Sequence, residues 1–486
     1  MRRAKIVCTL GPASSDPEIL KQMIQAGLDV ARLNFSHGTH DDHRRMYEMV
    51  RSLSVEVGKP VAILQDLQGP KIRVGKFENG SIELKTGDRL IITTEPVEGN
   101  QERVSTTYPN LPNDVNIGSV LLLDDGLLRL SVVQVTGHEV HTVVEVGGIL
   151  KNNKGINLPG VNVSAPSLTD RDKDDLELGL ELGVDYVALS FVRAALDMHM
   201  LRARIGDRYK APKLIAKIEK PEAVQELDAI IAVSDGIMIA RGDLGVELPP
   251  EKVPMFQKHA ILQATRQGCL TITATQMLDS MTNNPRPTRA EASDVANAIL
   301  DGSGAVMLSG ETASGRYPVE TIRMMDRIIR EVEQSPAYTN FKAPTPQTGA
   351  MRGGFTDAVA RAATVAADDL GVKALVAFTE SGRTARLLTS YRPSKKIIAC
   401  TPNSDVLHKL QLYWGVVPAT IERKNTIDDM VLAVERLLQD KGLAIAGDEV
   451  IIIMGTPFGV GAETNLIKFH RVGGLKRPTG SHRRRS

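Results

Sequence analysis

Cysteine is scarce in this chain of 486 residues, which contains only Cys8, Cys269 and Cys400. The number is odd, the spacing is wide and each cysteine lies in an apolar run. These features argue against a disulfide framework and against a zinc cluster. We therefore expect a reducing compartment, the cytoplasm.

Neither a charge excess nor a long apolar run is present. The formal net charge is +1, so neither a nucleic acid nor an anionic membrane is expected as the main partner. No apolar run approaches the roughly 18 residues that a membrane helix needs. Gly11-Pro12 interrupts the first apolar stretch before it reaches the length of a signal peptide. The basic segment His482–Arg485 is expected to be a solvated tail.

Several catalytic motifs are also missing. No HExxH or Walker A sequence occurs, and GVGAET from Gly459 lacks the third glycine of a dinucleotide-binding fingerprint. His40 and His43 stand three apart in THDDH, but the flanking acids favour a solvated first turn of a helix over a metal site. A zinc protease, a P-loop enzyme and a Rossmann enzyme are therefore disfavoured.

The chain does contain eight short, β-branched apolar runs separated by helix-length amphipathic segments. Such runs are typical of buried parallel strands joined by crossover helices. The pattern predicts an α/β fold, a (β/α)8 TIM barrel, although an open doubly wound sheet would produce similar local signals. The runs begin at Lys5, Val30, Val61, Tyr186, Leu214, Gly236, Cys269 and Ala305.

Two other segments predict further domains. Residues 70–166 are rich in Val, Thr and Gly, with turn signals at Gly87-Asp88 and Asp125-Gly126. They predict an inserted all-β lid domain, a β-barrel of antiparallel strands above the C-terminal face of the TIM barrel. After a linker rich in Pro and Thr, alternating helix and strand patterns over 350–475 predict a C-terminal α/β effector-binding domain. The catalytic barrel is expected to comprise residues 1–69 and 167–335.

Polar side chains gather where the expected barrel strands end, on the face where barrel enzymes place their chemistry. Each one alone is typical of an ion pair at a strand end, but their convergence indicates a functional site. They are Arg32, Asn34, Ser36, Asp66, Lys217, Glu219, Arg241, Gly242, Asp243, Thr275, Gln276, Ser309 and Glu311.

Three of these side chains indicate a particular chemistry. Glu219 and Asp243 offer hard oxygen ligands on neighbouring strands, which suits Mg²⁺. Lys217 is a point charge that can stabilise an oxygen becoming anionic. The turn containing Gly242 and Gly245 could present backbone N–H groups to a carboxylate or a phosphate. The set predicts an anionic, metal-chelating substrate.

Nine segments, in order, resemble the pyruvate kinase family over residues 1 to about 475. The resemblance implies a barrel with a lid, a C-terminal effector domain and a homotetramer. It also implies transfer of the phosphoryl group of phosphoenolpyruvate to ADP, giving pyruvate and ATP in the last step of glycolysis. The segments are KIVCTLGPAS from Lys5, ARLNFSHG from Ala31, QDLQGPKIR from Gln65, NNKGINLPG from Asn152, AKIEK from Ala216, ARGDLG from Ala240, TATQMLDSM from Thr273, PRPTRAEASDVANA from Pro285 and MLSGETA from Met307.

The resemblance also implies roles for single residues. Glu219 and Asp243 would hold the divalent ion, Mg²⁺ or Mn²⁺. Arg32 and Lys217 would contact the transferring phosphoryl group, and Lys217 would also stabilise the enolate that remains. Because the transition state of phosphoryl transfer is loose, catalysis would be mostly positioning and electrostatic stabilisation.

Further roles concern the substrate carboxylate and the nucleotide. The N–H groups of Gly242 and Asp243, with the hydroxyl of Thr288, would bind the carboxylate. Thr288 and Ser309 would belong to the relay that protonates the enolate. The expected nucleotide contacts are Asn34, Phe35, Ser36 and His37, together with Arg73 and Lys154 of the lid.

Two departures from the family pattern carry predictions of their own. Potassium-dependent members have Thr and Glu where this chain has Leu67 and Lys71. Leu67 offers no hydroxyl, and Lys71 adds a fixed ammonium near the expected monovalent-cation site of Asn34, Ser36 and Asp66. K⁺ is therefore expected not to be required.

The second departure is Ala194, which replaces a basic residue found in many relatives. This exchange is expected to alter nucleotide affinity or specificity, with Arg193 as a candidate to compensate.

A loop of the C-terminal domain is expected to bind an effector. Loops from Thr379 and from Gly455 each follow a strand, at the end where open α/β sheets bind ligands. The text ESGRTAR is more similar to bacterial members that respond to AMP or sugar monophosphates than to those that use fructose 1,6-bisphosphate. A phosphorylated effector is therefore expected at Thr379, Ser381, Gly382 and Thr384.

Two rival functions remain open. A metal-dependent barrel lyase or aldolase acting through an enolate would also use Lys217, Glu219 and Asp243, although the lid and Arg73 favour a nucleotide. A non-catalytic metabolite-binding protein on the same fold would be expected to have lost Lys217, Glu219 or Asp243. All three are present.

Overall fold

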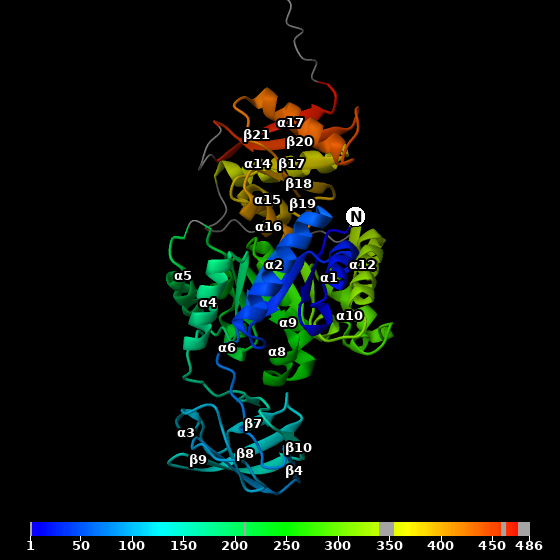
Figure 1. Ribbon diagram of the computed structural model, residues 1–486. Coiled ribbons are helices and arrows are strands. Elements are labelled where there is room, and N and C mark those ends of the chain that lie inside the picture. Colours follow the sequence, from blue (N-terminus) through cyan, green and yellow to red (C-terminus); the bar gives the residue numbers. More distant parts are fainter. Residues whose placement is uncertain (1, 209, 340–353, 458–462, 475–486) are drawn as a thin grey trace, which may run out of the picture.

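Eight parallel strands close into a barrel, as the apolar runs predict. The computed structural model describes all residues except 1, 209, 340–353, 458–462 and 475–486 (Figure 1). The strand order is β1-β16-β15-β14-β13-β12-β3-β2, so the open-sheet alternative is wrong. The strands are β1 (Lys5–Thr9), β2 (Val30–Asn34), β3 (Ala62–Asp66), β12 (Tyr186–Leu189), β13 (Lys213–Ile218), β14 (Gly236–Ala240), β15 (Leu270–Ala274) and β16 (Ala305–Leu308).

Helices surround the barrel because each strand must bury its outer face. All residues of β1, β3, β14 and β15 are buried. The surrounding helices include α1 (Pro17–Ala26), α2 (His40–Val57), α4 (Asp170–Leu182), α5 (Ala195–Ile205), α6 (Pro221–Gln225), α7 (Leu227–Val233), α8 (Arg241–Glu247), α9 (Val253–Arg266), α10 (Arg289–Leu300), α11 (Gly310–Ala313) and α12 (Pro318–Gln334).

The predicted helix start at THDDH is confirmed, although it is not fully solvated. Thr39 caps α2 by accepting a hydrogen bond from the N–H of Asp42. His40 Nε2 lies 2.6 Å from Asp175 Oδ1. His43 is buried, and its ring stacks on Phe35 with 3.8 Å between centroids. The histidine spacing therefore reflects packing and capping.

The lid lies at one end of the barrel and has its own apolar core (Figure 1). The strands of residues 70–166, all of which are described, form a six-stranded sheet and a two-stranded sheet, with isolated bridges between further segments. An all-β lid is thus confirmed, and its closure into a β-barrel stays a prediction. One pair, β5 with β6, is parallel. The lid elements are β4 (Ser81–Leu84), β5 (Arg89–Thr93), β6 (Arg103–Ser105), α3 (Leu111–Asp114), β7 (Val120–Leu123), β8 (Leu128–Thr136), β9 (Glu139–Val146), β10 (Gly148–Lys151) and β11 (Ile156–Asn157).

The C-terminal α/β fold lies at the opposite end of the barrel (Figure 1). Its strand order is β19-β18-β17-β20-β21. The sequence patterns predict the first four strands but not the edge strand β21, which pairs antiparallel with β20 and is only partly buried. The elements are α14 (Phe355–Leu370), β17 (Ala374–Phe378), α15 (Arg383–Ser390), β18 (Lys396–Thr401), α16 (Ser404–Lys409), β19 (Val416–Thr420), α17 (Ile427–Asp440), β20 (Glu449–Gly455) and β21 (Thr464–Arg471).

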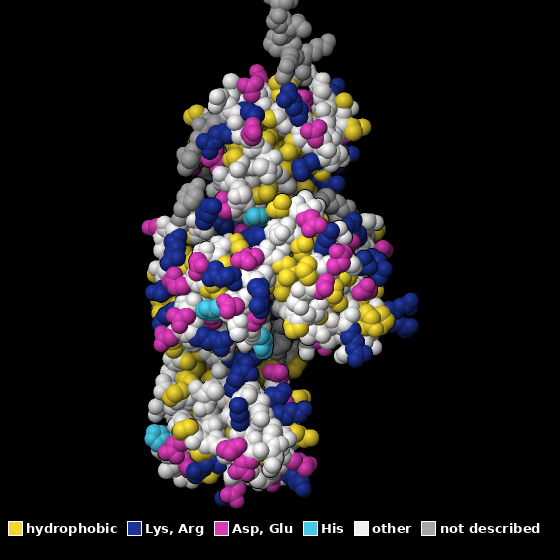
Figure 2. Space-filling model, in the orientation of Figure 1, with side chains coloured by type: hydrophobic (Ala, Val, Ile, Leu, Met, Phe, Trp, Pro, Cys, Tyr) yellow, Lys and Arg dark blue, Asp and Glu magenta, His cyan; other side chains and the backbone are white. Residues whose placement is uncertain are grey.

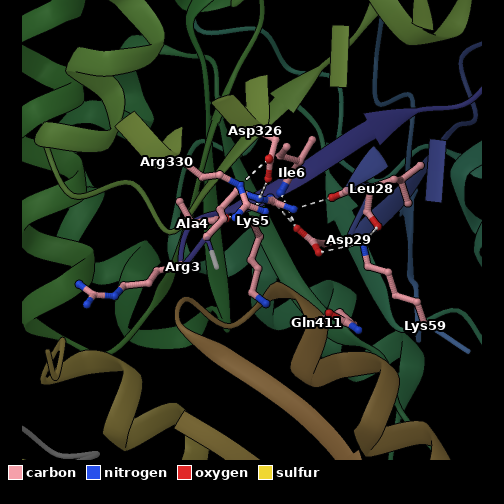
Figure 3. A network of polar contacts seen from close by, with 12 residues as sticks. Arg3, Ala4, Lys5, Ile6, Leu28, Asp29, Lys59, Asp326, Arg330 and Gln411 are labelled. Atoms are coloured by element: carbon pink, nitrogen blue, oxygen red, sulfur yellow. Dashed lines mark hydrogen bonds and ion pairs between the residues drawn. The ribbon is translucent and has the colours of Figure 1, made fainter. Parts of the chain in front are cut away.

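A polar network joins the first barrel strand to this C-terminal unit. The buried Lys5 Nζ donates to the carbonyl oxygen of Val416 at 2.8 Å. Figure 3 shows Lys5 extending from the barrel toward the C-terminal unit, with Asp29 and Lys59 nearby. Gln411 also donates to the carbonyl oxygen of Pro60 at 2.6 Å. The network holds the C-terminal unit against the end of the barrel that is remote from the lid.

Lys5 should make stability depend on pH. Burial lowers the pKa of Lys5 from 10.5 to about 8, so between these values the unfolded chain binds the extra proton. The contribution of Lys5 to stability therefore rises as pH increases from 8 to 10.5. Relative to Lys5→Met, the wild-type thermal midpoint should improve over this range, whereas Lys76→Met on the lid surface should show no such trend. Parallel pH curves for wild type and Lys5→Met would contradict the assignment.

Candidate active site

Lys217 lies at the centre of a buried charge cluster at the lid end of the barrel. Its Nζ is 2.7 Å from Glu219 Oε1 and 3.3 Å from Asp66 Oδ1, and it donates to Ser190 Oγ at 2.7 Å. Burial alone would lower the pKa of Lys217, but the carboxylates of Asp66 and Glu219 raise it well above its ordinary value. The ammonium is therefore a permanent positive charge.

Arg32 brings a second positive charge to the same place. Its Nε and Nη2 lie 2.7 and 2.6 Å from Asp66 Oδ2, and its Nη1 donates to Thr9 Oγ1 at 2.8 Å. Burial would raise the pKa of Asp66, but Lys217 and Arg32 lower it below its ordinary value. The ionised Asp66 thus orients both cations toward the mouth of the barrel.

Glu219 directly follows β13, and Asp243 lies in the first turn of α8, which follows the neighbouring strand β14. Glu219 Oε2 accepts a hydrogen bond of 2.9 Å from the N–H of Phe191. Burial raises the pKa of Glu219, Lys217 counteracts this, and the charge of Asp243 raises it further. Two carboxylates that repel each other in a buried site fit a divalent cation, which would relieve that repulsion. Mg²⁺ is typically held by one or two carboxylates and keeps several waters, so this pair of residues would be a sufficient protein ligand set.

Thr275 is a site residue to which the sequence analysis assigned no role. Its Oγ1 accepts a hydrogen bond of 2.7 Å from the N–H of Gly242, the group expected to bind the substrate carboxylate. Its φ is +72°, a left-handed conformation that costs energy for a β-branched residue. The Arg241 guanidinium stabilises this turn by donating to the carbonyl oxygen of Thr275 at 2.8 Å while it pairs with Asp294 at 2.7 Å. The only sequence signal for Thr275 was its position directly after the apolar run that forms β15.

Thr288 and Ser309 lie in different surroundings. Thr288 is exposed at the N-cap of α10, where its Oγ1 accepts from the N–H of Glu291 at 3.2 Å. Its hydroxyl accepts this cap bond and still has a proton to donate, whereas the hydroxyl of Thr275 donates to the carbonyl oxygen of Ala274 at 2.6 Å. Ser309 lines a cavity together with Arg32.

This cavity of about 950 Å³ opens between the ends of β1, β2 and β16 and is large enough for a nucleotide. Asn34 and His37 line it, as expected for nucleotide contacts. Phe35 is buried against His43, and the N–H of Ser36 donates to Asn34 Oδ1 at 3.2 Å. These two residues therefore support the cavity wall.

The lid presents its two candidate nucleotide ligands side by side. Arg73 pairs with Gly155 in an antiparallel bridge, and the N–H of Val74 donates to the carbonyl oxygen of Lys154 at 2.9 Å. Lys154 Nζ forms an ion pair of 2.7 Å with Asp124. In Figure 2, Lys and Arg side chains gather where the lid meets the barrel.

The expected monovalent-cation region contains the two unusual residues. Leu67 is 1% exposed and belongs to the apolar core of the barrel. Lys71 is exposed, and its charge acts on His37, whose pKa is lowered by burial and then by Lys71 and Arg73. The positive charge of Lys71 thus reaches the strand end that carries Asn34 and Ser36.

The effector-loop residues lie after β17. Thr379 Oγ1 accepts from the N–H of Gly382 at 3.0 Å, and Thr384 Oγ1 is 2.7 Å from Thr464 Oγ1. Gly382 is the N-cap of α15 and has φ +83°. Ser381 is exposed, so its hydroxyl is the accessible one. Residues 458 and 459 of the second predicted loop lie outside the described residues.

Arg193, the candidate to compensate for Ala194, has other partners. Its Nη2 donates to the carbonyl oxygen of Ala165 at 2.8 Å, and its Nη1 donates to that of Val163. Its guanidinium therefore binds the segment that returns from the lid to the barrel.

The fold and the charge cluster define a class of protein, a lidded barrel whose buried cations and carboxylates are typical of an enzyme for anionic substrates. Comparisons with known proteins narrow the class. Residues 1–322 match the pyruvate kinase barrel domain, and residues 357–470 match the pyruvate kinase alpha/beta domain. The chain therefore belongs to the pyruvate kinase family, whose members are phosphotransferases.

Individual relatives cover nearly the whole chain. A pyruvate kinase of Sporosarcina psychrophila is 47% identical over 98% of this chain and 81% of its own length. One of Geobacillus stearothermophilus is 46% identical over 98% of this chain and 81% of its own. The crystal structure of a pyruvate kinase from Cryptosporidium parvum superposes with a TM-score of 0.89 at 37% identity, covering 97% of this chain and 96% of that one. Among the described residues, no helix has the length and apolar character needed to cross a membrane.

Proposed function

We propose that this chain transfers the phosphoryl group of phosphoenolpyruvate to ADP, giving pyruvate and ATP in the last step of glycolysis. The observation that carries the proposal is the buried pair of cations, Lys217 and Arg32, held on Asp66 next to Glu219 and Asp243. Two cations suit the phosphoryl group, and two carboxylates suit the divalent ion that it brings.

Each residue of the cluster has a distinct task in this reaction. Glu219 and Asp243 would hold Mg²⁺ or Mn²⁺, which supplies neutralising charge to the phosphoryl and carboxylate oxygens. Arg32 and Lys217 bind the equatorial oxygens of the phosphoryl group as charge spreads over them. Lys217 then stabilises the enolate oxygen, and Ser309 belongs to the relay that protonates the enolate.

The lid supplies the nucleotide contacts. Arg73 and Lys154 bind the phosphates of ADP, while Asn34 and His37 contact it from the barrel. Lys154 exchanges Asp124 for a phosphate when the nucleotide enters. Closure of the lid excludes water from the transferring group and so prevents its hydrolysis.

Thr288 keeps its proposed role as the hydroxyl that binds the substrate carboxylate, because its cap bond from the N–H of Glu291 leaves its own proton free to donate. The hydroxyl of Thr275 already donates to the carbonyl oxygen of Ala274 at 2.6 Å. Thr288→Ala should raise KM for phosphoenolpyruvate about tenfold, the effect of one hydrogen bond to a charged group. Thr275→Ala should change this KM less, because it removes only the acceptor of the Gly242 N–H. Steady-state kinetics of both variants test the assignment, and the opposite pattern would transfer the role to Thr275.

The direct experiment is an assay of pyruvate formation from phosphoenolpyruvate and ADP with Mg²⁺ in potassium-free buffer. Activity is expected there, and added K⁺ should change it little. A folded protein that forms no pyruvate with or without K⁺ would refute the proposal. That result would favour a lyase or aldolase acting through an enolate, or a metabolite-binding protein.

Regulation forms a separate part of the proposal. A homotetramer in the cytoplasm would bind AMP or a sugar monophosphate at Thr379, Ser381, Gly382 and Thr384. Ser381→Glu places a carboxylate in this loop, so it should abolish activation by the phosphorylated effector while basal activity is kept. Equal activation of wild type and Ser381→Glu in an effector titration would refute the site.

A further inference from the structure

A buried charged contact joins the lid to the barrel next to Glu219. Glu247 ends α8 and is 6% exposed. Its Oε1 accepts from Lys220 Nζ at 2.5 Å and from Asn157 Nδ2 at 3.0 Å. Asn157 lies on β11, the last lid strand, and Lys220 directly follows Glu219. One carboxylate oxygen therefore connects a lid strand with an active-site loop.

The same contact borders the candidate metal ligands. Lys220 Nζ lies 5.6 Å from the centroid of the Phe191 ring, and the N–H of Phe191 donates to Glu219. Phe191 has φ +55°, so the surrounding contacts must stabilise its left-handed backbone. Asn157, Phe191, Lys220 and Asp243 all line one small cleft between lid and barrel. A change at Glu247 would thus reach the lid and the metal site together.

Other contacts between lid and barrel are weaker constraints on the lid strands. Arg193 binds Val163 and Ala165, which lie in the returning segment after β11. The turn at Gly126 lies near Val246, since a Cβ at Gly126 would be 3.7 Å from Val246 Cγ1. The contact between Gly126 and Val246 is apolar, so it does not fix the orientation of the lid. The hydrogen bond from Asn157 to the buried carboxylate of Glu247 depends strongly on distance and angle, so it does.

We propose that Glu247 is a positioning residue which, paired with Lys220, holds the lid over the active site through the side-chain amide of Asn157. A buried carboxylate already paired with an ammonium accepts one more neutral donor, and the amide of Asn157 meets that need. Loss of the donor would leave the carboxylate under-satisfied and the lid strand without its polar contact. The role in catalysis rests on the proposed function, but the position of the lid can be measured without substrate.

Aspartate at position 157 gives the sharpest test. Asn157→Asp places two carboxylates against one ammonium, so the lid should move away from the barrel. The double variant Asn157→Asp with Glu247→Gln exchanges the two groups and restores one amide, one carboxylate and Lys220. It should therefore recover the wild-type lid position, which loss of packing alone would not predict.

Lid position is read by pulsed electron spin resonance between labels at Val133→Cys in the lid and Met255→Cys on α9. Both sites are exposed, and the three native cysteines are buried. Wild type should give one narrow distance distribution. Asn157→Asp should shift the distance distribution to longer distances and raise KM for ADP about tenfold. Asn157→Ala should broaden the distribution. The double variant should restore both the wild-type distance distribution and the wild-type KM for ADP. Arg103→Met, which removes an ion pair with Glu139 inside the lid, is the matched control and should change neither.

Two results would overturn the proposal. One is an Asn157→Asp distribution that superposes on that of wild type. The other is a double variant that remains as displaced as Asn157→Asp, because the exchange of groups would then not matter. Since the distances are measured without substrate, failure of the proposed reaction would leave this test intact.

Discussion

Replacing Lys217 by Met is expected to lower kcat by about 10³-fold, the effect of removing one charged donor from the transition state of a buried site. Lys217 Nζ lies between Asp66 and Glu219, which hold it where the phosphoryl oxygens and the enolate oxygen would develop charge. A neutral side chain of similar length keeps the shape of the site and removes only its charge. Initial rates of pyruvate formation measure the loss.

The same substitution should also destabilise the barrel. It leaves the buried carboxylates of Asp66 and Glu219 without one shared cation, and breaking a buried pair costs about 3–5 kcal/mol. Lys213→Met is the matched control, because Lys213 begins the same strand at the other end of the barrel, where it pairs with Asp235 at 3.3 Å. Its kcat should stay close to that of wild type. A Lys217→Met enzyme that retained more than a tenth of the wild-type kcat would remove Lys217 from the reacting centre.

The barrel could be predicted because the same local feature, a short run of consecutive apolar residues, marks each of its strands. A strand that is covered on both faces needs consecutive apolar residues, so eight such runs are visible without knowledge of their partners. Their number favoured closure into a barrel over an open sheet without excluding the sheet, and the charged residues could be placed on one face because parallel strands end together. The lid sheets were less predictable, since alternating patterns identify strands but not whether the sheet closes. The exposed edge strand β21 lacks a continuous apolar run and was missed.

The parts of the site that the sequence could not reveal depend on contacts between distant residues. Thr275 becomes important through a left-handed turn and through Gly242, which lies 33 positions earlier in the chain. The sequence also gives no sign that the hydroxyl of Thr288 accepts the N-cap bond of α10. Likewise, no sequence feature near Asn157 indicates that its side-chain amide donates a hydrogen bond to Glu247, which lies 90 positions away. The spacing of residues in the sequence identifies candidate site residues, but only the folded structure shows which of them contact one another.

Replacing Lys71 by Glu is expected to convert the enzyme to one that needs potassium. The charge of Lys71 acts on His37 and hence on the region of Asn34 and Ser36. Its loss, with a new negative charge in its place, should lower kcat by about 10²-fold in potassium-free buffer, comparable to the loss of one stabilising group near the transferring phosphoryl. Added K⁺ should restore much of the activity, because a carboxylate and the oxygens of Asn34 and Ser36 are ligands suited to a hard cation.

Position 67 decides how complete that rescue can be. Leu67 is buried in the apolar core and contributes no side-chain oxygen, so Lys71→Glu alone supplies one fewer ligand than a variant with a hydroxyl at position 67 as well. The double variant Leu67→Thr with Lys71→Glu should therefore reach half-maximal activity at a lower K⁺ concentration than Lys71→Glu. Lys76→Glu makes the same charge change at an exposed lid position and should remain indifferent to K⁺. If Lys71→Glu were equally active with and without K⁺, the fixed ammonium could not be the substitute for the ion, and the proposed potassium independence would lose its basis in Lys71.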